Sequence, residues 1–139
     1  IDRPIGRDPQ VRTRQRVSDA GKPARTHVSV VTRFRVHTLV AAVLDTGRTH
    51  QIRVHMASLG MPLVGDRRYG AQRRLPPGAD DELIRCVTEF RRQALHAERL
   101  SFIHPRSGTP RSYSARPPAD LERLIALLDA DAARNSGSG

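Results

Sequence analysis

Two neighbouring runs of β-branched residues constrain the fold of this chain more than any other feature of its sequence. Residues 26–34 and 36–44 are rich in Val and Thr and roughly alternate between apolar and polar side chains. This pattern is typical of strands that bury one face. Because only Arg35 separates the two runs, the chain must reverse tightly there. The two strands are expected to pair, with their apolar faces on one side of a sheet.

The period of the apolar residues changes near residue 49. Ile52, Met56 and Leu59 recur at spacings of three and four residues, which predicts a short helix of about ten residues. Thr49 suits the N-cap of this helix, and Gly60 stands where a glycine commonly follows the last turn.

Strands and helices continue to alternate along the rest of the chain. The sequence predicts a helix over residues 82–90, a strand over 96–103 with a hairpin partner at 111–115, and a final helix after Pro117-Pro118. The expected fold is mixed α+β, with a mainly antiparallel sheet and short flanking helices. It is expected to occupy residues 1–132 as one domain, followed by a disordered tail at residues 133–139.

Positive charge is concentrated in the first half of the chain. Residues 1–74 contain 15 basic and 5 acidic side chains, whereas residues 75–139 contain 9 of each. A one-sided basic surface favours a polyanionic partner such as RNA, since phosphates gain from Arg contacts and from released counterions. The alternative is the solvated surface of a basic protein, without a specific partner.

The sequence gives no indication of secretion, of a membrane span or of a metal site. Cys86 is the single cysteine, so no internal disulfide is possible, and there is no apolar run of about 18 residues. His50 and His55 are five positions apart, which does not place them on one helical face as zinc ligands. We therefore expect a cytoplasmic protein with no metal and no membrane partner.

One long motif resembles a known enzyme family. Residues 46–55 read Thr-Gly-Arg-Thr-His-Gln-Ile-Arg-Val-His, followed by Pro-Leu-Val-Gly-Asp at 62–66 and Tyr-Gly at 69–70. Further matches lie at residues 21–24, 26–27, 92–97 and 104–105. Together they resemble the RluA/RluD-type RNA pseudouridine synthases of the large-subunit ribosomal type. The resemblance covers about residues 2–130 and implies the C-terminal half of the catalytic domain.

The resemblance implies an activity and the residues that serve it. Family enzymes isomerise uridine to pseudouridine in RNA without a cofactor, and they use an aspartate from a His-Arg-Leu-Asp segment. That segment does not occur in this sequence. The family's active-site arginine maps onto Arg53, as the ion-pair partner of that aspartate, and Ile52 maps onto a wall of the uracil pocket. The chain alone is therefore expected to be inactive and to need the N-terminal half of the domain as its partner.

Several polar residues around the motif are candidate RNA contacts. Arg48, Thr49, His50 and Gln51 lie at the expected helix N-terminus, where backbone N–H groups favour an anion. Arg67 and Arg68 lie in the following loop. Helix capping is the simpler role for Thr49. A non-catalytic, basic RNA-binding module remains the alternative to the enzyme.

Overall fold

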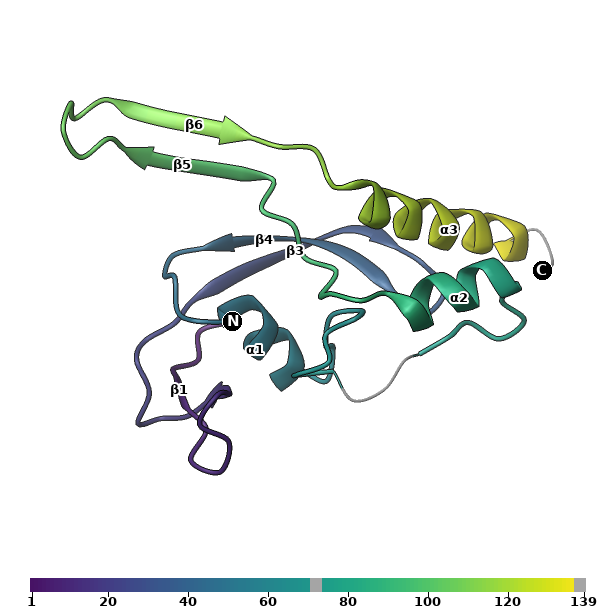
Figure 1. Ribbon diagram of the computed structural model, residues 1–139, viewed down its shortest axis with the longest axis horizontal. Coiled ribbons are helices and arrows are strands. Elements are labelled where there is room, and N and C mark those ends of the chain that lie inside the picture. The colour runs from purple at the N-terminus through teal and green to yellow at the C-terminus, as the bar shows by residue number, and fades with distance from the viewer. Residues whose placement is uncertain (71–73, 137–139) are drawn as a thin grey trace.

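A computed structural model of the chain describes residues 1–70 and 74–136 (Figure 1). In chain order the elements are β1 (Ile5–Arg7), β2 (Gln15–Val17), β3 (Thr26–Arg33), β4 (Thr38–Leu44), α1 (Gln51–Ser58), α2 (Asp81–Glu89), β5 (Arg99–Ile103), β6 (Pro110–Ser114) and α3 (Ala119–Ser136). The strands form three separate antiparallel pairs, β1–β2, β3–β4 and β5–β6. The expected α+β fold with antiparallel strands and short helices is confirmed.

The hairpin β3–β4 forms where the two β-branched runs predicted it. Phe34 donates its backbone N–H to the carbonyl of His37 at 2.9 Å and closes the tight reversal. The register shifts between Val30 and Thr32, which marks a bulge. The expected buried face is not covered within the described part of the chain. Exposed apolar side chains of this hairpin include Val28, Val30, Val31, Val43 and Leu44.

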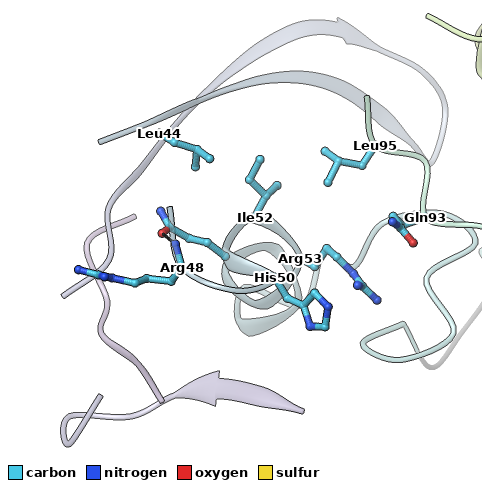
Figure 2. Close-up of a pocket in the computed structure, with 8 residues that line it drawn as sticks. Leu44, Arg48, His50, Ile52, Arg53, Gln93 and Leu95 are labelled. Atoms are coloured by element: carbon cyan, nitrogen blue, oxygen red, sulfur yellow. Dashed lines mark hydrogen bonds between the residues drawn. The ribbon is translucent and has the colours of Figure 1, made fainter. Parts of the chain in front are cut away.

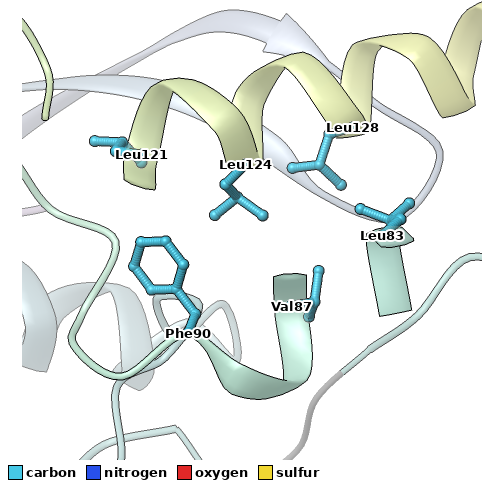
Figure 3. Packing of buried hydrophobic residues seen from close by; sticks show 6 residues of the cluster. All are labelled: Leu83, Val87, Phe90, Leu121, Leu124 and Leu128. Atoms are coloured by element: carbon cyan, nitrogen blue, oxygen red, sulfur yellow. The ribbon is translucent and has the colours of Figure 1, made fainter. Parts of the chain in front are cut away.

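The largest core lies between α2 and α3, which pack side by side (Figure 1). Its members are Leu83, Val87, Phe90, Leu121, Leu124 and Leu128 (Figure 3). Burying each such side chain contributes roughly 1.5–3 kcal/mol. Phe34 and Val64 pack against this cluster, so the β3–β4 turn and the loop after α1 are held by the same core. Asp131, almost fully buried, pairs with Arg35 at 3.1 Å and fastens that turn to α3.

Helix α3 continues four residues beyond the boundary expected at residue 132. The side chains of Asn135 and Ser136 donate to the carbonyls of Asp131 and Ala132, both at 2.8 Å, one turn earlier in the same helix. Residues 133–136 are therefore helical, and the rest of the expected disordered tail, residues 137–139, lies outside the described residues.

Hairpin β5–β6 extends away from the rest of the molecule (Figure 1). All ten residues of its two strands are exposed. Leu100 faces Tyr113 across the pair, and the rings of Phe102 and Tyr113 stack with centroids 6.1 Å apart. The hairpin therefore presents apolar and aromatic surface that no described element covers.

At Gly65 the loop after α1 lies close to the segment that follows α2. Its φ is +73°, and a Cβ at this position would overlap the carbonyl of Arg92 and the ring of Phe90. The close approach allows the N–H of Ala94 to bond the carbonyl of Val64 at 2.8 Å. Gly60 has the same φ of +73° but open space around the Cβ position. It confirms the predicted glycine after α1, where it completes the helix C-terminus.

The two glycines provide a matched test of this close approach. Gly60→Ala is expected to destabilise by about 1 kcal/mol, because only the left-handed backbone is strained. Gly65→Ala is expected to cost at least about 2 kcal/mol, because steric overlap is added to the same strain. Thermal unfolding of the full-length variants measures both effects. Equal shifts in melting temperature would contradict the close approach.

Candidate active site

A buried hydrogen-bond network attaches α1 to the start of β3. The amide Nε2 of Gln51 donates to the carbonyl of Arg25 at 2.8 Å and to Oγ1 of Thr26 at 3.0 Å. His55 contacts Oγ1 of Thr26 through Nδ1 and the carbonyl of Arg3 through Nε2, both at 2.9 Å. A carbonyl only accepts, so Nε2 of His55 carries the proton and Nδ1 accepts from Thr26. The network satisfies every member and fixes the orientation of α1.

Gln51 also organises the turn that precedes α1. Its Oε1 accepts from the hydroxyl of Thr46 at 2.8 Å and from the backbone N–H of Arg48 at 2.9 Å. Both amide hydrogens and both oxygen lone pairs are thus engaged within the chain. The prediction that Gln51 contacts RNA is not supported by this geometry, and its role is structural.

The N-cap of α1 differs from the expectation. The helix begins at Gln51, and His50 is the N-cap residue with φ 58° and no side-chain capping bond. Thr49 is exposed, so the prediction of Thr49 as the N-cap is wrong. The chain enters the helix through a left-handed residue, and Oε1 of Gln51 bonds the Arg48 N–H that precedes it. A threonine N-cap is typically extended, whereas the residue at this N-cap is left-handed.

Arg53 forms a bidentate ion pair with Asp66 in the loop after α1. Its Nε and Nη2 donate to the two carboxylate oxygens, both at 2.8 Å. The Asp66 side chain is 0% exposed and that of Arg53 is 13% exposed. Burial acts to raise the pKa of Asp66, but hydrogen bonds from Arg53 and from the backbone N–H groups of Tyr69 and Arg68 outweigh it and leave the pKa lowered. Asp66 is thus a charged positioning group.

Tyr69 lies between Arg53 and His50. The guanidinium carbon of Arg53 stands 4.9 Å from the centre of its ring, a favourable cation–π geometry. The tyrosine hydroxyl accepts the backbone N–H of Gln15 at 3.0 Å and contacts Nδ1 of His50 at 2.9 Å. The side chains from α1, its preceding turn and the 66–69 loop therefore form one connected group with strand β2.

A pocket of about 350 Å³ opens beside α1. Figure 2 shows Ile52 pointing between Leu44 and Leu95, with Arg53 and His50 below it. Arg48, Gln51 and Gln93 complete the lining. Five of the residues singled out in the sequence are thereby brought together, with an apolar wall on one side and a cation on the other.

Three candidate residues lie outside this pocket. Thr49 is exposed beside it. Arg67 lines a separate, open hollow of about 620 Å³ with Thr88, Glu89 and Arg91. The guanidinium of Arg68 donates to the carbonyl of Thr13 at 2.6 Å and so holds the β1–β2 loop. Arg67 and Arg68 remain predicted RNA contacts.

Sequence reasoning did not assign five residues of the site, namely Leu44, Asp66, Tyr69, Gln93 and Leu95. Asp66 and Tyr69 lie within the Val-Gly-Asp and Tyr-Gly parts of the family-like motif, and Gln93 and Leu95 lie within the matching stretch at 92–97. The family-like stretches around these four residues were the sequence signal from which they could have been predicted as site residues. The Arg53 partner could not be found from spacing, because Asp66 lies thirteen positions further along the chain.

The arrangement can bind a flat base and orient an anion. Ile52 with Leu44 and Leu95 provides apolar contact, and Nη1 of Arg53 has no hydrogen-bond partner among residues 1–70 and 74–136. Asp66 is not available as a nucleophile, because Arg53 and two backbone N–H groups occupy its oxygens. In the described segments no three His, Cys, Asp or Glu side chains cluster as a metal site. No described helix is long and apolar enough to cross a bilayer.

Comparison with known proteins gives consistent matches. A family model for RNA pseudouridylate synthase matches residues 1–58. Ribosomal large subunit pseudouridine synthase D of Xanthomonas campestris pv. campestris is 52% identical over 133 residues, 96% of this chain and 40% of the relative. The proteins of that name from Xylella fastidiosa and Escherichia coli K12 are 50% and 48% identical, covering 96% and 94% of this chain. The chain spans 40% of the length of each of these relatives.

The Arg53–Asp66 pair predicts a large stability effect. Arg53→Ala leaves a buried carboxylate without its cation and is expected to cost about 3–5 kcal/mol. Arg123→Ala, which breaks the exposed pair with Glu82, is the control and is expected to cost at most about 1 kcal/mol. Chemical unfolding of the full-length variants tests this difference. Similar losses in the two variants would contradict a buried pair.

The same variant is expected to shift acid unfolding. The folded-state pKa of Asp66 lies below its ordinary value of 3.8, so its stabilisation is present above that value and is lost as pH falls through the folded pKa. Removing Arg53 raises that folded pKa. Acid unfolding of Arg53→Ala should therefore occur at higher pH than that of the Arg123→Ala control.

Proposed function

This chain belongs to the RluA/RluD type of the RNA pseudouridylate synthase family, and on that premise we propose that its protein isomerises uridine to pseudouridine in RNA. The proposed substrate is RNA of the large ribosomal subunit, for which the relatives are named. The reaction breaks the N-glycosidic bond, turns the base and rejoins it through carbon, so no atoms are gained or lost. The proposal includes no cofactor and a cytoplasmic location.

The observation that carries this proposal is the position of Arg53 beside an apolar pocket. Ile52 provides the surface against which a flipped uracil packs. Arg53 is held by Asp66 through Nε and Nη2, which leaves Nη1 as the group for a second carboxylate. We assign that carboxylate to the catalytic aspartate of the family, from a segment outside these 139 residues.

The Arg53–Asp66 pair has a consequence for the proposed catalytic aspartate. Because Asp66 already compensates the charge of Arg53, the second carboxylate receives only part of the guanidinium's field. Its orientation towards Nη1 then matters more than its simple proximity. A Lys at position 53 keeps the charge but cannot bind two carboxylates in a fixed plane.

The exposed apolar faces support a further protein partner for the chain. Two apolar surfaces are exposed to water in the described part of this chain. One is formed by Leu100, Phe102 and Ile103 on β5, and the other by the exposed valines of β3–β4. Exposed apolar surfaces of this kind commonly mark a protein interface. We assign their coverage to the N-terminal half of the catalytic domain. The chain alone is then an inactive part of the enzyme.

RNA contact is assigned to the cationic residues around the pocket. Arg48 lines it, and its side chain makes one hydrogen bond within residues 1–70 and 74–136, from Nε to the carbonyl of Pro23. Arg67 and Arg68 are exposed in the following loop, and Thr49 is exposed beside the pocket. Gln51 is excluded from this set because its amide is fully engaged.

The alternative function is a basic RNA-binding module without catalysis, and the concentration of positive charge in residues 1–74 favours it. Tritium release from RNA labelled at the uracil C5 position separates the two. We expect release by the full-length protein, and RNA binding without release by residues 1–139. Absence of release by the full-length protein on its RNA would favour the binding module.

Arg53→Lys is the sharper activity test, because it keeps the positive charge. It is expected to reduce kcat by at least about 100-fold, since one oriented charge-assisted interaction is lost in the reacting complex. RNA affinity should change only a few-fold. Arg123→Lys on α3 is the control and should retain full turnover. Wild-type kcat in folded Arg53→Lys would contradict the assigned role.

The proposed RNA contacts predict a change in salt dependence. Replacing Arg48, Arg67 and Arg68 together by Gln should weaken RNA binding and lower the slope of log affinity against log salt by about one unit or slightly less per lost phosphate contact. The control replaces Arg85, Arg123 and Arg134 on α2 and α3, which removes the same charge. Equal slopes in the two triple variants would contradict a one-sided RNA surface.

A further inference from the structure

His50 has an uncommon, left-handed backbone conformation, and its side chain makes no capping hydrogen bond that would account for it. Its φ is 58°, and no other non-glycine residue in the described part of the chain has a positive φ. Left-handed conformations cost a β-carbon residue free energy and persist where surrounding structure holds them, often at functional sites. Asn or Gly would fit this backbone position with less strain. The imidazole is therefore the feature of interest.

The hydroxyl of Tyr69 determines which ring nitrogen of His50 carries the proton. This hydroxyl accepts the N–H of Gln15, and among the described residues the acceptor within reach of its own hydrogen is Nδ1 of His50. Nδ1 is then the acceptor and Nε2 carries the proton. Burial lowers the pKa of His50, and the charges of Arg53 and Arg68 lower it further, so the ring is neutral near pH 7.

Nε2 of His50 is free to bind a ligand. It makes no hydrogen bond within the described segments, where the single buried side-chain polar atom without a partner is Nδ1 of His37. Nε2 therefore reaches solvent, and His50 lines the pocket beside Arg53 (Figure 2). The geometry provides one N–H donor of fixed orientation at the edge of the base pocket.

Charges around the ring select the kind of acceptor. Arg14 lies 5.4 Å from the centre of the Tyr69 ring, and Arg68 is close enough to act on His50. Neither forms an ion pair within the described residues, whereas Asp66 is committed to Arg53. The surroundings of His50 thus have excess positive charge, which favours a phosphate oxygen over a neutral carbonyl.

We propose that His50 binds the RNA substrate as a neutral donor, with its Nε2–H directed to a backbone phosphate oxygen next to the nucleotide held over Ile52. Tyr69 is the positioning residue that fixes the proton on Nε2. The inference rests on the proposed function, because it takes the pocket as the site of the flipped nucleotide. It adds a specific donor, its protonation state and its ligand group.

Two substitutions separate the donor from the fold. His50→Asn tolerates the left-handed backbone and places a polar group near Tyr69, but it has no donor at the Nε2 position. His50→Gln extends an amide N–H towards that position. In the full-length protein we expect His50→Asn to weaken RNA binding by about 10- to 100-fold and His50→Gln to stay within a few-fold of wild type. Both variants should remain folded, which thermal unfolding checks. Equal affinities of the two variants would overturn the donor role.

Methylphosphonate substitution identifies the acceptor. A series of RNAs is prepared, each with a single neutral methylphosphonate at a different linkage near the target uridine. The affinity of each RNA is measured for the wild-type protein and for His50→Asn. One linkage should abolish the affinity difference between the two proteins. An unchanged difference at every linkage would overturn the phosphate assignment.

Tyr69→Phe tests the positioning role through a pH profile. Without the hydroxyl, Nδ1 of His50 loses the donor that keeps it unprotonated, so RNA affinity should gain a dependence on pH below the ordinary histidine pKa of 6.5. That dependence should disappear in the double variant Tyr69→Phe, His50→Gln. An equal loss of RNA affinity at every pH would show that Tyr69 has only a structural role and would overturn its positioning role. Wild-type turnover, measured in parallel, keeps failure of this inference distinct from failure of the proposed function.

Discussion

The buried bonds between Gln51, Thr26 and His55 are the interaction on which the site depends. They occupy one side of α1 and leave Ile52 and Arg53 on the side that faces the pocket. Inside a protein, such a satisfied network holds a single geometry, because every alternative would leave a buried polar group unpaired. A short helix of eight residues could not keep its orientation through apolar burial alone, since Val54 and Met56 are its two buried apolar residues.

The walls of the pocket come from segments that are distant in sequence. Gln93 and Leu95 reach α1 because the N–H of Ala94 bonds Val64 and because Gly65 permits the approach of the Arg92 carbonyl. Arg92 in turn pairs with Asp120 at the start of α3 at 2.7 Å. Packing of α2 on α3 is thereby connected to the position of the pocket wall. Changes in that core are expected to act on the site through this segment.

Pairing, as well as charge count, decides which arginines can meet RNA. Arg92, Arg123 and Arg134 are bound to acidic side chains on or beside the helices. The balanced composition of residues 75–139 nevertheless hides a local excess, because residues 99–116 contain four arginines and no acidic residue. A count over half of the chain averages over this local excess, and the ion pairs of Arg92, Arg123 and Arg134 depend on the tertiary structure.

The sequence by itself determined the local elements and the identity of the family. Alternating β-branched residues predicted β3 and β4, the spacing of Ile52 and Met56 predicted α1, and Gly60 marked its end, because these signals depend on neighbours a few residues apart. The motif at residues 46–70 likewise predicted Ile52 and Arg53 as site residues, and both line the pocket. Only the tertiary structure decided that Gln51 is structural, that His50 and not Thr49 is the N-cap, and that Asp66 and Tyr69 hold Arg53 and His50. Those roles depend on which hydrogen-bonding groups meet in space, and no spacing along the chain specifies that.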